Sequence, residues 1–209
     1  MTPENFVNQF GIARASAILR TDNQEKAAMA MEAAIRGGFT ICEFTLTVPG
    51  VYELVNDFSR REGLIVGTGT VMDINDAQLS VDAGAQFLVS PVMDEAVIAE
   101  AHELGVASMP GTHTPTEMLL AQRAGAQLCK LFPAPHGGPA WVSAVLGPMP
   151  GLKIVPTNGV DEYNAAKWIA AGAFAVGYVA TLFNAEDIKS GNWDAIEERA
   201  GRCLAAAQS

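Results

Sequence analysis

Cysteine, basic residues and long apolar runs are scarce in this sequence. The 209-residue chain has 13 lysines and arginines against 23 aspartates and glutamates, which gives a net charge of -10 at pH 7. Because nucleic-acid binding needs a basic footprint, this balance argues against nucleic acid as a partner. No apolar run approaches the roughly 18 residues that a membrane-spanning helix requires, so we expect no membrane contact.

The N-terminal residues show no targeting signal, and the cysteines show no metal-binding pattern. The N-terminal stretch MTPENFVNQFGIARAS has no basic segment followed by an apolar core, so we expect no signal peptide and a cytoplasmic protein. Cys42, Cys129 and Cys203 are odd in number and have no metal-ligand spacing. We therefore interpret them as free thiols rather than a zinc site, and we expect no metal.

The sequence does contain a repeated pattern, in which glycine precedes a short apolar run. Glycine just past a helix supplies the left-handed residue that ends it, and the runs that follow are too short for helices. They predict strands that are buried on both faces. Five passages share the pattern: RGGFTICEFT (36–45), DAGAQFLVSP (82–91), ELGVASMPG (103–111), RAGAQLCKLFP (123–133) and AAGAFAVGY (170–178).

Three further predicted strands, at 13–19, 64–67 and 153–156, bring the number to eight. Most strands are followed by a helix-start signal, and Thr114 with Glu117 matches a capping box. The other signals are Thr21-Asp22-Asn23, Asp73, Asp94 and Asp161. Eight strands alternating with eight helices predict an α/β protein, a (β/α)8 TIM barrel forming a single domain over residues 1–209. The alternative is an open doubly wound sheet, which is disfavoured because no GxGxxG follows the first strand.

Lys130 interrupts the apolar run of the sixth predicted strand. A barrel places its reactive groups at the C-terminal ends of the strands, so a polar residue there is of interest. Side chains alternate along a strand. If Lys130 points into the barrel, Leu128 and Phe132 do so too, while Cys129 and Leu131 face the helices.

On the second strand, if Glu43 points inward, Cys42 and Phe44 face outward in the same way. Desolvation lowers the pKa of an ammonium group, and a neutral amine can attack a ketone to form a Schiff base. A carboxylate within reach suits general acid/base work. Other interpretations remain open. Lys130 can extend to the barrel rim or form a structural ion pair with Glu43, Arg20 can be a solvated residue before a helix, and His113 and His136 can be surface residues.

Several motifs together resemble those of the KDPG/KHG aldolase family, the 2-keto-3-deoxy-6-phosphogluconate (KDPG) and 4-hydroxy-2-oxoglutarate (KHG) aldolases. They are EFTLTVPG, GTGTV, SP, MPGTHTPTE, CKLFPA and VPTNGV, and the resemblance covers about residues 10–185. It implies a class I lyase of carbohydrate metabolism, as in the Entner-Doudoroff route. Such an enzyme cleaves KDPG to pyruvate and glyceraldehyde 3-phosphate, or 4-hydroxy-2-oxoglutarate to pyruvate and glyoxylate. The resemblance also implies a homotrimer, with small 2-keto acids as its ligands and no cofactor.

The resemblance assigns roles residue by residue. Lys130 corresponds to the Schiff-base lysine, and Glu43 to the general acid/base that works through a bound water. Arg20 corresponds to an arginine that ends the first strand in one branch of the family and holds the pyruvate carboxylate; the other branch has its arginine where this chain has Thr47. The residues implied to bind substrate are Arg20, Thr70, Pro91, Phe132, Thr157, Asn158 and Gly159.

The phosphate end departs from the family pattern. Asn158 and Val179 replace glycines, and Ala180 replaces a serine, which should weaken a backbone nest for phosphate. Thr181, Asn158 or His136 could compensate. A non-phosphorylated 2-keto-3-deoxy acid is therefore an alternative substrate, and a phosphate-binding barrel lyase or isomerase without a covalent intermediate is an alternative activity. A catalytically silent binding protein is a third reading.

Overall fold

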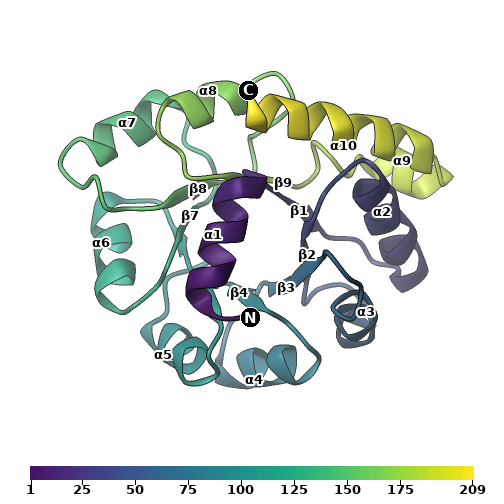
Figure 1. The fold of residues 1–209 in the computed structure, drawn as a ribbon, viewed down its shortest axis with the longest axis horizontal. Coiled ribbons are helices and arrows are strands. Elements are labelled where there is room, and N and C mark those ends of the chain that lie inside the picture. Colours follow the sequence, from purple (N-terminus) through teal and green to yellow (C-terminus); the bar gives the residue numbers. More distant parts are fainter.

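The computed structural model describes residues 1–209 and alternates strands with helices. Figure 1 shows the strands gathered at the centre and helices α2 to α10 around them. The strands are β1 (Ala15–Leu19), β2 (Ile41–Thr45), β3 (Ile65–Gly69), β4 (Phe87–Val89), β5 (Ala107–Met109), β6 (Gly111–Thr112), β7 (Cys129–Leu131), β8 (Ile154–Pro156) and β9 (Val176–Tyr178). The helices are α1 (Pro3–Ala13), α2 (Gln24–Arg36), α3 (Val51–Phe58), α4 (Ile74–Asp82), α5 (Glu95–Glu103), α6 (Pro115–Arg123), α7 (Ala140–Leu146), α8 (Ala165–Ala170), α9 (Ala185–Ser190) and α10 (Trp193–Gln208).

All strand pairs are parallel, and they form a curled six-stranded sheet and a three-stranded sheet. The strand orders are β5-β4-β3-β2-β1-β9 and β6-β7-β8. The sheets approach each other at two places. Pro110 separates β5 from β6 and accepts a hydrogen bond from Lys130 N at 2.9 Å, while Phe174 N donates to Ile154 O at 2.8 Å. The structure thus has nine strands where the sequence predicts eight, because the predicted strand around Pro110 is divided there.

Side chains alternate between two apolar clusters, as the sequence predicts. Cys129 and Leu131 belong to the larger cluster, between the strands and the surrounding helices. Leu128 belongs to the smaller cluster, inside the curl of the sheets. On β2, Cys42 and Phe44 lie in the larger cluster in the same way. This alternation is confirmed, and it directs the intervening polar residues of β2 and β7 inward.

Helix α1 covers the end of the strands opposite the polar residues, and Figure 1 shows it crossing in front of them. Phe6 and Phe10 are fully buried, and both belong to the inner cluster. The Phe6 ring stacks on Phe87, with 4.4 Å between the ring centroids. Helix α1 is not among the helices that the strand–helix alternation predicts. Its signal was Thr2, whose side chain accepts a hydrogen bond from Asn5 N, followed by proline at the first helical position.

The predicted helix starts agree with the observed caps at four positions. Asn23, Asp73, Asp94 and Thr114 are N-caps, and Thr114 forms the predicted capping box with Glu117. Asp161 differs, because it accepts hydrogen bonds from Tyr163 N and Asn164 N in a turn before α8. A further helix, α9, was not predicted. No helix combines the length and the apolar character that crossing a membrane would require.

The Phe6–Phe87 contact makes the contribution of α1 measurable. Phe6→Ala should lower the free energy of unfolding by about 3–5 kcal/mol, because it removes a fully buried aromatic ring and leaves a cavity. The matched control is Ile12→Ala on the same helix, where the residue is 72% exposed and the expected change is within about 0.5 kcal/mol. Urea unfolding of both variants gives the comparison. A Phe6→Ala cost below that of the control would mean that α1 does not cover the inner cluster in solution.

Candidate active site

Lys130 and Glu43 meet in the interior, from strands on opposite sides of the curl. Lys130 Nζ lies 3.9 Å from Glu43 Oε1, and the two side chains are 10% and 0% exposed. This separation is too long for a hydrogen bond, so the pair interacts through its charges across a short gap. The Phe132 ring lies near the same amine, with its centroid 5.3 Å from Lys130 Nζ. The structure therefore brings together the amine and the carboxylate that the sequence singles out.

Glu43 is buried without compensation from hydrogen bonds. Neither of its carboxylate oxygens has a hydrogen-bond partner in the protein. Desolvation raises the pKa of Glu43, while the charges of Lys130 and Arg20 act in the opposite direction. A carboxylate in this setting takes up and releases a proton nearer to neutral pH than an exposed one, which suits general acid/base chemistry.

Two glycines of β3 lie close to Glu43 or to the ring packed below it. The Cα neighbour of Glu43 in β3 is Gly67. A Cβ built on Gly69 would overlap Glu43 Oε1, and a Cβ on Gly67 would collide with Phe87. The absence of a side chain on Gly69 therefore leaves room for the Glu43 carboxylate, while the absence of one on Gly67 leaves room for Phe87.

Arg20 and Thr70 form a second polar pair, just beyond the ends of β1 and β3, the two strands that flank β2. The Arg20 guanidinium donates a hydrogen bond to Thr70 Oγ1 at 3.2 Å. Arg20 is exposed, so its remaining N–H groups are available to a ligand. Thr70 has a left-handed φ of 65°, a conformation that costs free energy for a residue with a branched Cβ. Strain held at this point is consistent with a ligand-binding turn.

The other predicted residues lie in two groups. Pro91 and Phe132 line a cavity of about 260 Å³, and His113 lies in the same lining with its Nδ1 3.1 Å from Pro133 O. Thr157 is fully buried, and its hydroxyl has no hydrogen-bond partner. Asn158 and Gly159 follow it with φ values of 56° and 134°. Asn158 thus takes a left-handed conformation that asparagine tolerates better than most residues, so replacing glycine there does not exclude a glycine-like turn.

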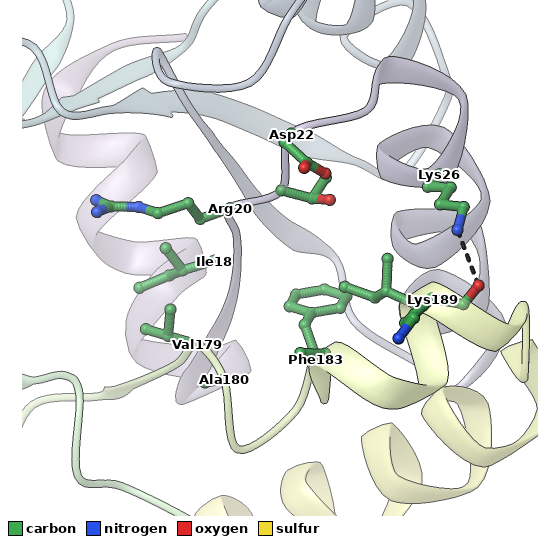
Figure 2. Close-up of a pocket in the computed structure, with 11 residues that line it drawn as sticks. Ile18, Arg20, Asp22, Lys26, Val179, Ala180, Phe183 and Lys189 are labelled. Carbon is green, nitrogen blue, oxygen red and sulfur yellow. Dashed lines mark hydrogen bonds between the residues drawn. The ribbon is translucent and has the colours of Figure 1, made fainter.

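A cavity of about 600 Å³ adjoins Arg20 of the Arg20–Thr70 pair, and it was not predicted. It is lined by Arg20 but not by Lys130 or Glu43, which lie deeper. Figure 2 shows Arg20 extending away from Lys26 and Asp22 within it. Lys26 and Lys189 are functional candidates that sequence reasoning missed. Each lies on a helix surface with an ordinary helical pattern, so no local signal marks them.

The cysteines are removed from this site. All three are free and buried, and two of them, Cys42 and Cys129, lie on the outward faces of β2 and β7. Burial raises the pKa of each thiol to about 12, so the thiols stay protonated near neutral pH. They are not candidates for the nucleophile. The amine of Lys130 is the one nucleophilic group that faces the buried carboxylate.

Comparison with known proteins adds independent information. The family model described as "KDPG and KHG aldolase" matches residues 7–199. The chain is 36% identical over 170 residues to a probable 2-dehydro-3-deoxy-6-phosphogalactonate aldolase of Rhizobium meliloti, covering 80% of each chain. It is 32% identical over 195 residues to a 2-dehydro-3-deoxy-phosphogluconate aldolase of Pseudomonas aeruginosa, covering 92% of this chain and 88% of that one.

A solved structure extends the likeness to three dimensions. The KDPG aldolase from Legionella pneumophila, determined with pyruvate captured as a covalent carbinolamine intermediate, superposes with a TM-score of 0.79 at 25% identity. The match covers 93% of this chain and 96% of that one. The fold and the chain length are therefore shared nearly end to end.

The uncompensated burial of Glu43 should be visible in the pH dependence of stability. A pKa raised in the folded state means that the protonated form favours folding, and that this contribution is lost as pH rises through the folded pKa. The substitution Glu43→Gln removes this pH-dependent contribution to the free energy of unfolding. The free energy of unfolding of Glu43→Gln, relative to the unaltered protein, should therefore increase from about pH 4 to pH 8.

Urea unfolding at several pH values measures this difference. Glu53→Gln, on the exposed side of α3, reports the effect of removing a carboxylate from the surface. A difference between Glu43→Gln and the unaltered protein that stays constant or shrinks with rising pH would contradict the raised pKa of Glu43.

Proposed function

The chain belongs to the KDPG and KHG aldolase family, and from this we propose that Lys130 and Glu43 carry out Schiff-base cleavage of a 4-hydroxy-2-keto acid. The substrate is KDPG, which yields pyruvate and glyceraldehyde 3-phosphate, or 4-hydroxy-2-oxoglutarate, which yields pyruvate and glyoxylate. The observation that carries the proposal is the buried Lys130–Glu43 pair, with its 3.9 Å separation and its carboxylate free of hydrogen bonds.

The chemistry proceeds through an imine of Lys130. The amine adds to the ketone carbon, and loss of water gives a protonated imine. As the bond between carbons 3 and 4 breaks, its electron pair moves toward the imine nitrogen and gives an enamine. Glu43 accepts the proton of the 4-hydroxyl, directly or through water, and the aldehyde leaves. Return of a proton to carbon 3 and hydrolysis of the imine release pyruvate and restore the amine.

Arg20 and Thr70 hold the carboxylate of the pyruvate half. A guanidinium binds a carboxylate through two parallel hydrogen bonds, and Arg20 has free N–H groups beyond the one that it donates to Thr70. Pro91 and Phe132 line the pyruvate pocket. Thr157, Asn158 and Gly159 contact the aldehyde half, where the unpartnered hydroxyl of Thr157 is available to a substrate hydroxyl.

The proposal extends to the architecture in which this site works. The two sheets form one closed (β/α)8 barrel, a single domain over residues 1–209, and the links at Pro110 and between Phe174 and Ile154 support closure. The parallel bridge between Thr157 and Gly177 supports it too. The protein acts as a homotrimer in the cytoplasm, and the reaction uses no cofactor because the imine serves as the electron sink.

Reductive trapping tests the covalent step. Incubation with pyruvate and borohydride should reduce the imine to a secondary amine, which adds one carboxyethyl group to Lys130. Mass spectrometry of the intact protein and of the peptide that contains Lys130 locates the adduct. Lys130→Arg should give no adduct and lose cleavage activity by about a thousandfold or more, because a guanidinium cannot form the imine.

The matched control is Lys153→Arg, at a position just before β8 that is not part of the Lys130–Glu43 pair. It should be trapped like the unaltered protein. Absence of any adduct in the unaltered protein, or substantial activity in Lys130→Arg, would refute the covalent mechanism and favour a lyase or isomerase that works without it.

The room that Gly69 leaves for Glu43 gives a second test. Gly69→Ala should lower kcat for cleavage by about tenfold to a hundredfold, because the new methyl group displaces the carboxylate that moves protons. Gly147→Ala is the control, since its Cβ would meet only ordinary van der Waals contacts. Equal kcat values for the two variants would show that the position of the Glu43 carboxylate does not limit the rate.

A further inference from the structure

Ser16 of β1 points into the interior between the two sheets. Ala15 and Ala17 belong to the larger apolar cluster beneath the helices, so the alternation along β1 turns Ser16 inward. Its Cα partner on β9 is Gly177, and a Cβ built on Gly177 would lie 3.5 Å from Ser16 Oγ. Ser16 is fully buried, and its hydroxyl has no hydrogen-bond partner in the protein. A buried hydroxyl is costly unless another polar group lies within reach.

The register of the strands places Ser16 one step below Glu43. Ala17 of β1 pairs with Cys42 of β2, and Ile18 pairs with Glu43. Ser16 and Glu43 are therefore diagonal neighbours on adjacent strands, with roughly 8 Å between their Cα atoms from the strand spacing and the rise of two residues. Neither carboxylate oxygen of Glu43 has a hydrogen-bond partner in the protein. Two buried polar groups without partners thus face the same part of the interior.

The other surroundings of Ser16 are apolar. On the side of α1 the interior is filled by the side chains of the smaller cluster. On the side of β9, a Cβ built on Gly177 would meet the Thr157 methyl carbon at 2.5 Å, so Thr157 turns its methyl group and not its hydroxyl to this point. The polar side chains that remain for the Ser16 hydroxyl are those of the Lys130–Glu43 pair, and Glu43 is on the adjacent strand.

One water molecule would satisfy both groups. No hydrogen bond joins Ser16 to Glu43 directly. An internal water makes two to four hydrogen bonds, typically to buried polar groups that have no other partner. The serine hydroxyl can donate or accept such a bond, and the carboxylate can accept one. Glu43 Oε1 faces Lys130 and the strand end at Gly69, so a water held by Ser16 meets the carboxylate from the opposite side.

We propose that Ser16 is a positioning residue of the cleavage reaction, whose hydroxyl holds one water molecule against the side of the Glu43 carboxylate that points away from the substrate. The inference rests on the proposed function and adds a residue to it. This water differs from any water between Glu43 and the 4-hydroxyl, because it lies on the closed side of the carboxylate. A hydrogen bond to a carboxylate stabilises its charged form, so the water keeps the desolvated Glu43 able to accept a proton.

A crystal structure of the unaltered protein tests the position of the water. At a resolution that orders internal waters, one water molecule should lie within about 3 Å of both Ser16 Oγ and an oxygen of Glu43. The crystal structure of Ser16→Ala should lack it. No water at Ser16 in the unaltered protein, or a water that contacts Ser16 but not Glu43, would overturn the inference.

The pH dependence of kcat tests what the water does. Lys130 and Arg20 are the charged groups that act on Glu43, and Ser16→Ala leaves both in place. Loss of the hydrogen bond should raise the pH of the acidic limb of kcat by about 0.5–1 unit, because the charged form of Glu43 is stabilised less. On that limb kcat should fall by about threefold to tenfold. KM should change little, because Ser16 does not touch the substrate. A purely structural disturbance would instead lower kcat equally at every pH.

Two further variants separate the hydrogen bond from packing. Ser80→Ala is the matched control, since Ser80 also has a fully buried hydroxyl without a partner, but on α4 in the outer layer. Its acidic limb should stay in place. Ser16→Thr keeps a hydroxyl and should keep the limb close to that of the unaltered protein. An unmoved limb in Ser16→Ala, or an equal movement in Ser80→Ala, would contradict the role of Ser16.

Borohydride trapping of pyruvate tests the proposed function separately. An adduct at Lys130 together with an unmoved limb in Ser16→Ala refutes only the role of Ser16. The absence of an adduct in the unaltered protein refutes the aldolase mechanism on which the inference rests.

Discussion

The burial of one carboxylate without hydrogen bonds is the constraint on which the rest of the site depends. Glu43 loses its hydration and gains only the charge of Lys130 across 3.9 Å, with Arg20 further away. Burying a charged group in this way is costly, so the surrounding fold must supply the stability elsewhere. It does so through two apolar clusters, one on each face of the strands. The same burial that makes the site costly raises the pKa of the Glu43 carboxyl.

The second requirement of the site is glycine on β3. Because Gly69 has no side chain, the space beside the Glu43 carboxylate stays open, and the lack of a side chain on Gly67 lets Phe87 pack closely. Strand interiors disfavour glycine, since it contributes no packing and loses more conformational entropy on folding. Gly69 therefore reflects the site, whereas Gly67 reflects the packing of Phe87. Packing below this level is recovered by aromatic side chains, such as Phe87 against Phe6.

The sequence allowed the interior to be predicted better than the rim. Alternation along a strand is local and has a period of two, so a single inward residue, Lys130, was enough to orient Cys129, Leu131 and their neighbours. Caps such as Thr114 are equally local, since the hydrogen bonds join residues three apart. Lys26 and Lys189 face one cavity only because α2 and α9 lie side by side, although 163 residues separate them in the chain. No pattern of hydrophobicity or spacing encodes a meeting of that kind, and the docking of α1 on distant strands was missed for the same reason.

Helix α1 has a consequence for the movement of protons and water. Phe6 and Phe10 are fully buried and fill the end of the strands opposite the polar residues, so we expect the interior to open toward solvent at the polar end. Under the proposed chemistry the substrate lies in that opening, between Glu43 and bulk water. A proton that Glu43 takes from the 4-hydroxyl then cannot leave through the α1 end while the products remain bound. It stays available for return to carbon 3 of the pyruvate half. The aromatic side chains of α1 should therefore favour return of the transferred hydrogen to carbon 3 over its exchange with solvent, although they lie far from the bond that breaks.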